Sequence, residues 1–188
     1  MSYKEELIKS MKLLSDNGYI FIGQNMVFGG TSMFHTMTDI PIEQRIELPV
    51  FEDIQSGMAT GMALEGLKVC SVYPRMDFLL LAMNQIINHL DKADMMSDGQ
   101  FKPKVIIRTA VGSKEPLMPG PQHCQDYSTE LAMMCWNIDV IKLNRAEDVY
   151  PAYEKALKSD KSTILIELPD VYNQEMTDIF IKSRQERK

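Results

Sequence analysis

A carboxylate stands at the start of a helical pattern that contains two unexpected glycines. In "PVFEDIQSGMATGMALEGL", Glu52 precedes Gly57 and Gly61, which are four residues apart. Each glycine costs a helix about 1 kcal/mol relative to alanine. The pair therefore indicates close approach by another segment or chain, because glycine has no side chain to hold a neighbour away. Glu52 is then either a carboxylate stabilised by the helix dipole, worth ~0.3–1 kcal/mol, or a functional acid.

A histidine in a long, proline-containing loop is the second candidate for chemistry. His123 lies in "PGPQHCQD", within a loop at residues 110–127 that is longer than most connections of its kind. Its imidazole can exchange a proton near neutral pH, or can simply hydrogen-bond its own loop. A nucleophilic pair of Cys124 with His123 as its base is a poor candidate, because adjacent side chains rarely face one another and no orienting acid is evident. No zinc-ligand spacing is present, and we expect this chain to hold no metal.

Short apolar strands and the helices between them must position these residues. The predicted strands are residues 19–23, 45–48, 68–73, 104–109, 138–143 and 162–168, and the predicted helices are 3–17, the helix starting at Glu52, 78–90, 128–135 and 146–159. Strands that alternate with helices favour parallel pairing, with crossover helices on both faces. We therefore expect an α/β fold with a mostly parallel six-stranded sheet. Ligands bind beyond the carboxyl ends of such strands, where Gln24, Glu52, Phe78 and His123 would fall.

Composition limits the classes of function. The 188 residues carry a net charge of −6, which does not favour binding to nucleic acid or to an anionic membrane. The three cysteines are few and odd in number, as in a cytoplasmic protein with reduced thiols, and no apolar run reaches the ~20 residues of a membrane span. We expect one domain at residues 1–170 and a polar, helical tail at 171–188. The sequence has no Walker lysine loop, no G-x-G-x-x-G after a strand, and no Gly-Asp-Gly followed by Asn.

Several motifs occur together in one order. They are "PVFEDIQSGMATGMALEGLKVCSVYPRMDFLLLAMNQIINHLDKA", then "GPQHCQD", then "VIKLNRAEDVYPAYEKALKSDKSTILIELP". In this order they resemble the pyrimidine-binding domain of transketolase-type thiamine diphosphate enzymes, above all the beta subunits of 2-oxoacid dehydrogenase decarboxylating components. The pattern shared is Pro-x-x-Glu, a helix of small residues, an aromatic segment before an Asn-Gln-Ile-Ile-Asn helix, and a later Gln-His. The resemblance covers residues 19–168.

The resemblance implies roles for the candidate residues. Glu52 aligns with the glutamate that hydrogen-bonds the aminopyrimidine ring and lets this ring act as a base. Phe78 would pack against that ring, with Tyr73 or Met76 as alternatives one short shift away. His123 aligns with the histidine that faces the substrate and donates a proton or a hydrogen bond to developing oxygen charge.

Two departures from the family pattern are evident. Relatives carry an acidic residue after the first strand, in a proton relay between active sites, and this sequence has Gln24 there. Glutamine can hydrogen-bond but cannot carry a proton, so the relay would be altered or absent. The sequence also ends soon after "ILIELP", so we expect the carboxy-terminal domain of the beta subunits, and docking to an acyltransferase core through it, to be lacking.

The resemblance implies one subunit of a split enzyme. A separate diphosphate-binding, alpha-like subunit would hold the diphosphate with Mg or Ca, and two such pairs would form a heterotetramer. The substrate would be a 2-oxoacid or a ketose, cleaved beside its carbonyl with transfer of the acyl or aldehyde unit. Two alternatives are a transketolase-like carboligase subunit of specialised metabolism and a catalytically silent scaffold paralogue.

Overall fold

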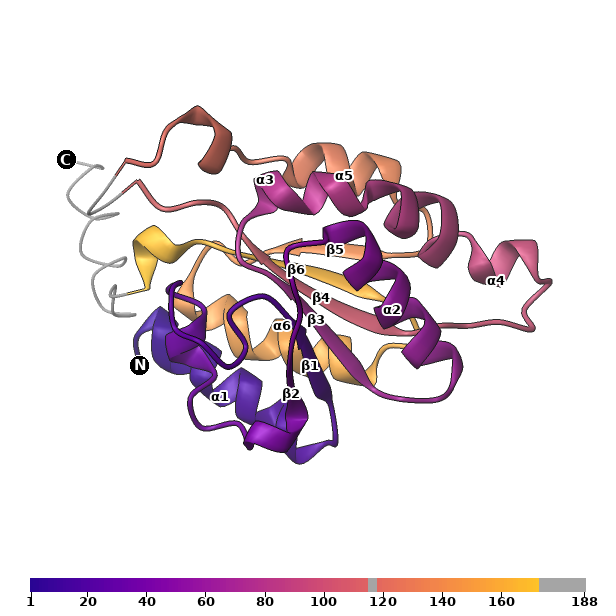
Figure 1. Ribbon diagram of the computed structural model, residues 1–188, viewed down its shortest axis with the longest axis horizontal. Coiled ribbons are helices and arrows are strands. Elements are labelled where there is room, and N and C mark those ends of the chain that lie inside the picture. Colours follow the sequence, from indigo (N-terminus) through magenta and orange to yellow (C-terminus); the bar gives the residue numbers. More distant parts are fainter. Residues whose placement is uncertain (115–117, 173–188) are drawn as a thin grey trace.

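The computed structural model describes residues 1–114 and 118–172, which form a six-stranded sheet covered by helices (Figure 1). The strands are β1 (Ile20–Gly23), β2 (Arg45–Glu47), β3 (Val69–Tyr73), β4 (Val105–Ala110), β5 (Asp139–Lys142) and β6 (Thr163–Glu167). Their order is β2-β1-β3-β4-β6-β5, and every pairing is parallel. The predicted α/β class and all six predicted strands are confirmed.

Helices cover both faces of the sheet. The α-helices are α1 (Tyr3–Asp16), α2 (Glu52–Leu64), α3 (Met76–Leu79), α4 (Ala93–Met96), α5 (Ser128–Met134) and α6 (Ala146–Lys158). Short 3-10 helices are η1 (Phe34–Thr36), η2 (Ile42–Gln44), η3 (Leu80–Ala82), η5 (Pro121–His123) and η6 (Pro169–Val171), and η4 (Asn84–Leu90) is a π-helix. Helices α1 and α6 pack on one face, and α2, α3 and α5 pack on the other (Figure 1).

The two faces are buried by alternating residues of the same strands. In β3, Cys70 and Val72 join the cluster formed with α1 and α6, while Val69 and Tyr73 join the cluster formed with α2 and α3. All five residues of β3 are buried. Burial on both sides explains why the strands read as continuous apolar runs rather than as alternating patterns.

The segment predicted as one long helix at residues 78–90 is helical but irregular. It comprises α3, the 3-10 turn η3 and the seven-residue π-helix η4 in succession. Asp91, which is fully buried, follows directly and accepts backbone N–H bonds from Trp136 at 2.9 Å, Asn137 at 2.7 Å and Ile138 at 3.0 Å. Burial opposes ionisation of Asp91, but the Lys92 ammonium and these N–H groups outweigh it and lower the pKa.

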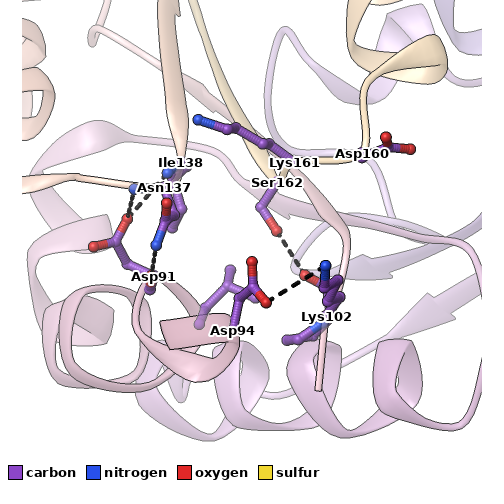
Figure 2. Close-up of a pocket in the computed structure, with 10 residues that line it drawn as sticks. Asp91, Asp94, Lys102, Asn137, Ile138, Asp160, Lys161 and Ser162 are labelled. Atoms are coloured by element: carbon purple, nitrogen blue, oxygen red, sulfur yellow. Dashed lines mark hydrogen bonds and ion pairs between the residues drawn. The ribbon is translucent and has the colours of Figure 1, made fainter. Parts of the chain in front are cut away.

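A small cavity lies beside Asp91, at the amino ends of β4, β5 and β6. Its volume is about 180 Å³, and Figure 2 shows Asp91 turned toward Asn137 and Ile138. The candidate residues named above follow the carboxyl ends of the strands, at the opposite edge of the sheet. This cavity is therefore separate from them.

The predicted tail begins within the described residues and extends beyond them. Tyr172 is buried and its ring stacks on that of Tyr3, with the ring centroids 5.7 Å apart. The rest of the predicted tail, residues 173–188, lies outside the described part of the chain. Within the described ranges, no helix is long and apolar enough to cross a bilayer.

Candidate functional site

The order of the strands places a topological switch point between the carboxyl ends of β1 and β3. These strands are neighbours, but the chain continues from β1 to β2 on one side and from β3 to β4 on the other. Such a switch point is where parallel sheets hold ligands. Gln24 directly follows β1, Tyr73 ends β3, and Glu52 begins the helix that leads from β2 to β3.

Glu52, at the start of α2 beside this switch point, is buried and has a hydrogen-bond donor. Its side chain is only 4% exposed, whereas the next residue, Asp53, is exposed. The Gln24 amide donates from Nε2 to Glu52 Oε1 at 3.0 Å. A buried carboxylate without a partner is costly, and the positive end of α2 adds favourable charge. The structure therefore brings the predicted Glu52 and Gln24 into direct contact.

Tyr73 and Met76 are both core residues. Tyr73 is 1% exposed, and burial raises its pKa to about 12; the Ser71 and Ser56 hydroxyls lower it and the charge of Glu52 raises it further. Met76 is fully buried, and its Sδ accepts the backbone N–H of Tyr127 at 2.9 Å. Contact of either side chain with a ligand stays a prediction.

Phe78 and His123 form an edge-to-face pair. Their ring centroids are 5.3 Å apart and the rings are perpendicular. Both side chains are partly exposed, and the buried Nδ1 atom of His123 has no hydrogen-bond partner among the described residues. The pair thus joins a partly exposed aromatic ring to a partly exposed imidazole.

The turn that carries His123 is tied to the start of α3. Arg75 Nη1 donates to the His123 carbonyl oxygen at 3.5 Å, and both the backbone N and Nε2 of Gln125 donate to Asp77 Oδ1 at 3.3 Å. On its other side, the turn packs directly on Gly112, where an added Cβ would lie 1.4 Å from the His123 carbonyl oxygen. Only glycine leaves room for this backbone contact.

Replacing Gly112 by alanine is expected to move the His123 turn away from Phe78. A Cβ that meets backbone must displace it, and overpacking of this kind costs typically ~1–3 kcal/mol. Because the Phe78 and His123 rings are perpendicular with centroids 5.3 Å apart, the ring-proton signals of this pair should change their ring-current shifts in proton NMR spectra of the variant. Gly61→Ala is the control, because its Cβ would meet nothing within 4 Å. Unchanged His123 signals in Gly112→Ala would contradict this packing.

Two supporting residues were not identified from the sequence. Gln55, one helical turn after Glu52, is 1% exposed and donates from Nε2 to Ser71 Oγ at 3.0 Å and to the Val72 carbonyl at 2.9 Å. Glu47, the last residue of β2, accepts backbone N–H bonds from residues 25–27. The i, i+3 spacing of Gln55 from Glu52 was an available signal, whereas nothing local distinguished Glu47.

The described residues offer little for a metal ion. Among residues 1–114 and 118–172, no group of three or more His, Cys, Asp or Glu side chains is arranged to hold one. The structure instead shows two separate groupings: a buried carboxylate with an amide donor, and an aromatic ring paired with an imidazole. Such groups can bind a heterocycle and exchange protons with it.

Comparison with curated proteins finds beta subunits of the pyruvate dehydrogenase E1 component among the relatives. The chain is 29% identical over 126 residues to the pyruvate dehydrogenase E1 component subunit beta of Ascaris suum, covering 67% of this chain and 34% of the relative. Corresponding values are 30% over 128 residues for the chloroplastic subunit beta-3 of Arabidopsis thaliana (68% and 31%) and 26% over 165 residues for subunit beta of Cyanidium caldarium (84% and 48%). The chain thus spans about a third to a half of these relatives. No protein-family profile matches it.

Solved structures share the fold. A split-gene transketolase, described as an inactive beta4 tetramer, superposes with a TM-score of 0.68 and 14% identity, covering 90% of this chain and 52% of that one. The transketolase of Campylobacter jejuni superposes with a TM-score of 0.70 and 13% identity, covering 90% and 26%. At these identities the likeness concerns the fold alone.

Proposed function

Because the chain is a homologue of pyruvate dehydrogenase E1 beta subunits and has the fold of transketolase-type thiamine diphosphate enzymes, we propose that it is the pyrimidine-binding subunit of a split enzyme of this kind. The reaction would be decarboxylation or carbon–carbon cleavage of a 2-oxoacid or ketose, with transfer of the acyl or aldehyde unit. The observation that carries the proposal is the buried carboxylate of Glu52 at the β1/β3 switch point.

The described residues suit the aminopyrimidine end of the coenzyme. Glu52 would hydrogen-bond a ring nitrogen, and its burial would make that bond strong by excluding water. Phe78 would pack against the ring, a contact worth ~0.5–1.5 kcal/mol beyond burial. His123 would contact bound substrate through the part of its imidazole that stays exposed.

The chemistry divides between coenzyme and chain. When bound, thiamine diphosphate supplies an electron sink for the bond that is cleaved beside the substrate carbonyl. Glu52 would exchange a proton with the ring nitrogen it contacts, and so set the protonation of the heterocycle. His123 would donate a proton or hydrogen bond to the substrate oxygen on which negative charge develops. Gln24 would orient Glu52, because the Gln24 amide donates a hydrogen bond to it but has no ionisable group that could carry a proton.

A second chain is required because no diphosphate-binding motif is evident in the sequence. The relatives are named as beta subunits and as the product of a split gene, which supports a separate diphosphate-binding subunit that also holds Mg or Ca. Two copies of each chain would then make a heterotetramer, as proposed from the family resemblance.

We place the seam with that partner at the exposed face of α2. A largely apolar groove of about 550 Å³ runs between α2 and residues 85–101, and its walls include Gly57, Gly61, Leu64 and Phe101. A Cβ added at Gly57 would lie 3.6 Å from the Gln85 side chain, whereas a Cβ at Gly61 would meet nothing within 4 Å in the described chain. Exposed apolar surface of this kind is typical of protein contacts. A partner chain packed in this groove would also explain why Gly61 is a glycine although its own chain leaves room for a side chain there.

The transketolase-like alternative is compatible with the same fold. Both transketolases superpose over 90% of this chain. Because fold does not determine the substrate, a ketose donor must be compared directly with 2-oxoacids.

Reconstitution tests the proposal. The chain should be mixed with the product of a neighbouring gene that carries Gly-Asp-Gly followed by Asn, together with thiamine diphosphate and Mg. Turnover of pyruvate, longer 2-oxoacids and a ketose is then measured with an artificial electron acceptor or an aldehyde acceptor. We expect neither chain to turn over substrate alone, and the mixture to do so. Tight coenzyme binding and turnover by the lone chain would contradict the split site, and a complex without either would identify a scaffold.

A variant in the groove tests the seam. Gly61→Leu should prevent complex formation in gel filtration, while circular dichroism of the isolated chain stays unchanged. Lys155→Leu on α6, which lies on the other face of the sheet, is the control, because it also adds an exposed leucine to a helix. Normal assembly of the Gly61→Leu chain would place the partner elsewhere.

A further inference from the structure

We infer that Glu47 is a positioning residue that holds Gln24 against Glu52 and thereby leaves the second oxygen of Glu52 to the coenzyme ring. The inference deepens the proposed function and rests on it for its catalytic part. It concerns three side chains from three different elements: the end of β2, the residue after β1, and the first residue of α2.

The Glu47 carboxylate binds the backbone turn that follows β1. Its Oε1 accepts the N–H of Asn25 at 2.8 Å, and its Oε2 accepts the N–H groups of Met26 at 2.7 Å and Val27 at 2.8 Å. Both oxygens of one carboxylate are therefore committed to three successive amides. Hydrogen bonds to a charged acceptor are roughly twice as strong as neutral ones, so this carboxylate largely determines the path of the turn.

The turn needs such support. Asn25 has φ +57°, a left-handed conformation that is uncommon outside glycine. On the same side, Arg45 Nη1 donates to the Met26 carbonyl at 3.1 Å. Gly23 pairs with Glu47 in the register of β1 and β2. Gln24 is thus held between a residue fixed in the sheet and a residue fixed by Glu47.

The consequence falls on Glu52. With the backbone on both sides of Gln24 restrained, its amide reaches Glu52 Oε1 at 3.0 Å. A neutral amide can donate to that oxygen but cannot exchange a proton with it. One oxygen of the buried carboxylate is then occupied by a fixed donor, and the other is assigned to the aminopyrimidine nitrogen. In this chain, Gln24, which Glu47 holds in place, therefore stands where the family pattern has an acidic residue next to the glutamate.

A purely structural Glu47 would stabilise the turn without affecting Gln24 or Glu52. NMR on the isolated chain separates the two roles without partner or coenzyme. In Glu47→Gln, the side-chain NH₂ signals of Gln24 should shift and exchange faster with solvent, together with the backbone amides of residues 25–27. Glu43→Gln, an exposed change in the adjoining turn η2, is the charge-matched control. Faster exchange at residues 25–27 with unchanged Gln24 NH₂ signals would overturn the inference.

A double-mutant cycle on the reconstituted enzyme tests the catalytic part. Glu47→Gln and Gln24→Leu should each lower kcat roughly tenfold with little change in KM, as loss of an orienting group commonly does. The double variant should be no worse than the more impaired single variant, because both act through one contact. Multiplicative losses would overturn the inference.

Two precautions keep the outcomes distinct. If Glu47→Gln does not fold, Glu47→Asp retains the charge but shortens its reach, and it should give a smaller change in the same Gln24 signals. If wild-type chain and partner show no turnover, the proposed function has failed. The NMR comparison then decides by itself whether Glu47 holds Gln24.

Discussion

Replacing Glu52 by glutamine is expected to lower turnover of the reconstituted enzyme by about 100- to 10,000-fold. Glutamine preserves the shape of the side chain and can still accept the Gln24 N–H, but it cannot exchange a proton with the ring nitrogen that Glu52 is proposed to contact. The loss should therefore fall on kcat, since it removes an interaction made in the transition state. Steady-state kinetics with saturating coenzyme measure it.

Asp53→Asn is the matched control for this experiment. Asp53 lies beside Glu52 in the first turn of α2 and is exposed, so this variant removes the same charge from the same end of the helix. We expect it to retain nearly normal kcat, and both variants to assemble with the partner. A Glu52→Gln enzyme with an undiminished rate would refute the proposed acid–base role.

Replacing Glu167 by leucine is expected to lower the free energy of unfolding by ~3–5 kcal/mol, the usual cost of breaking a buried ion pair. Arg108 and Glu167 are both fully buried, and Arg108 donates to both oxygens of Glu167. Burial alone would lower the pKa of Arg108, but the adjacent Glu167 carboxylate holds this pKa well above its ordinary value. Leucine would leave a buried, uncompensated guanidinium.

The same carboxylate also binds two tyrosines. Tyr153 donates to Glu167 Oε1 at 3.1 Å and Tyr172 donates to Oε2 at 2.5 Å, while Arg108 Nη2 donates to Thr36 Oγ1 at 2.7 Å. Burial and the charge of Glu167 raise the pKa of both tyrosine hydroxyls well above the ordinary value. One substitution thus removes the side-chain hydrogen bonds through which Glu167 in β6 holds Arg108 in β4, Tyr153 in α6 and Tyr172 after η6.

Urea unfolding followed by circular dichroism measures this effect, with Lys12→Met as control. Lys12 forms an exposed ion pair with Asp16 at 2.9 Å, and such pairs contribute only ~0–1 kcal/mol. The double variant Arg108→Met/Glu167→Leu should be more stable than Glu167→Leu, because no buried charge is left unpaired. Equal stability of the single and double variants would show that the loss comes from packing rather than charge.

Local patterns in the sequence were enough to predict the six strands and the fold class. Strands such as β3 and β6 are apolar throughout because both faces of a parallel sheet are buried, and this leaves a continuous hydrophobic run in the sequence. The helix starting at Glu52 was likewise predictable, from the helical spacing of its apolar residues such as Ile54, Met58 and Met62. Roles for Glu52, Phe78 and His123 came from their resemblance to a family, and they stay predictions until tested.

Features that depend on distant residues were not predictable in this way. The irregular helix of α3, η3 and η4 ends at Asp91, whose partners lie more than forty residues away in the sequence. Met76 is fully buried and its sulfur accepts a hydrogen bond from the backbone of Tyr127, fifty-one residues away in the sequence. Neither arrangement leaves a periodic signal in the local sequence.

The sequence by itself determined which segments become strands and helices, because the period and apolarity of each segment depend on neighbours along the chain. It also placed Gln24 and Glu52 after the first and second predicted strands. Only the tertiary structure decided that β1 lies beside β3, that Gln24 donates to Glu52, and that Glu47 supports the turn at residues 25–27. These contacts depend on strand order and register, which are determined by packing between segments far apart in the chain.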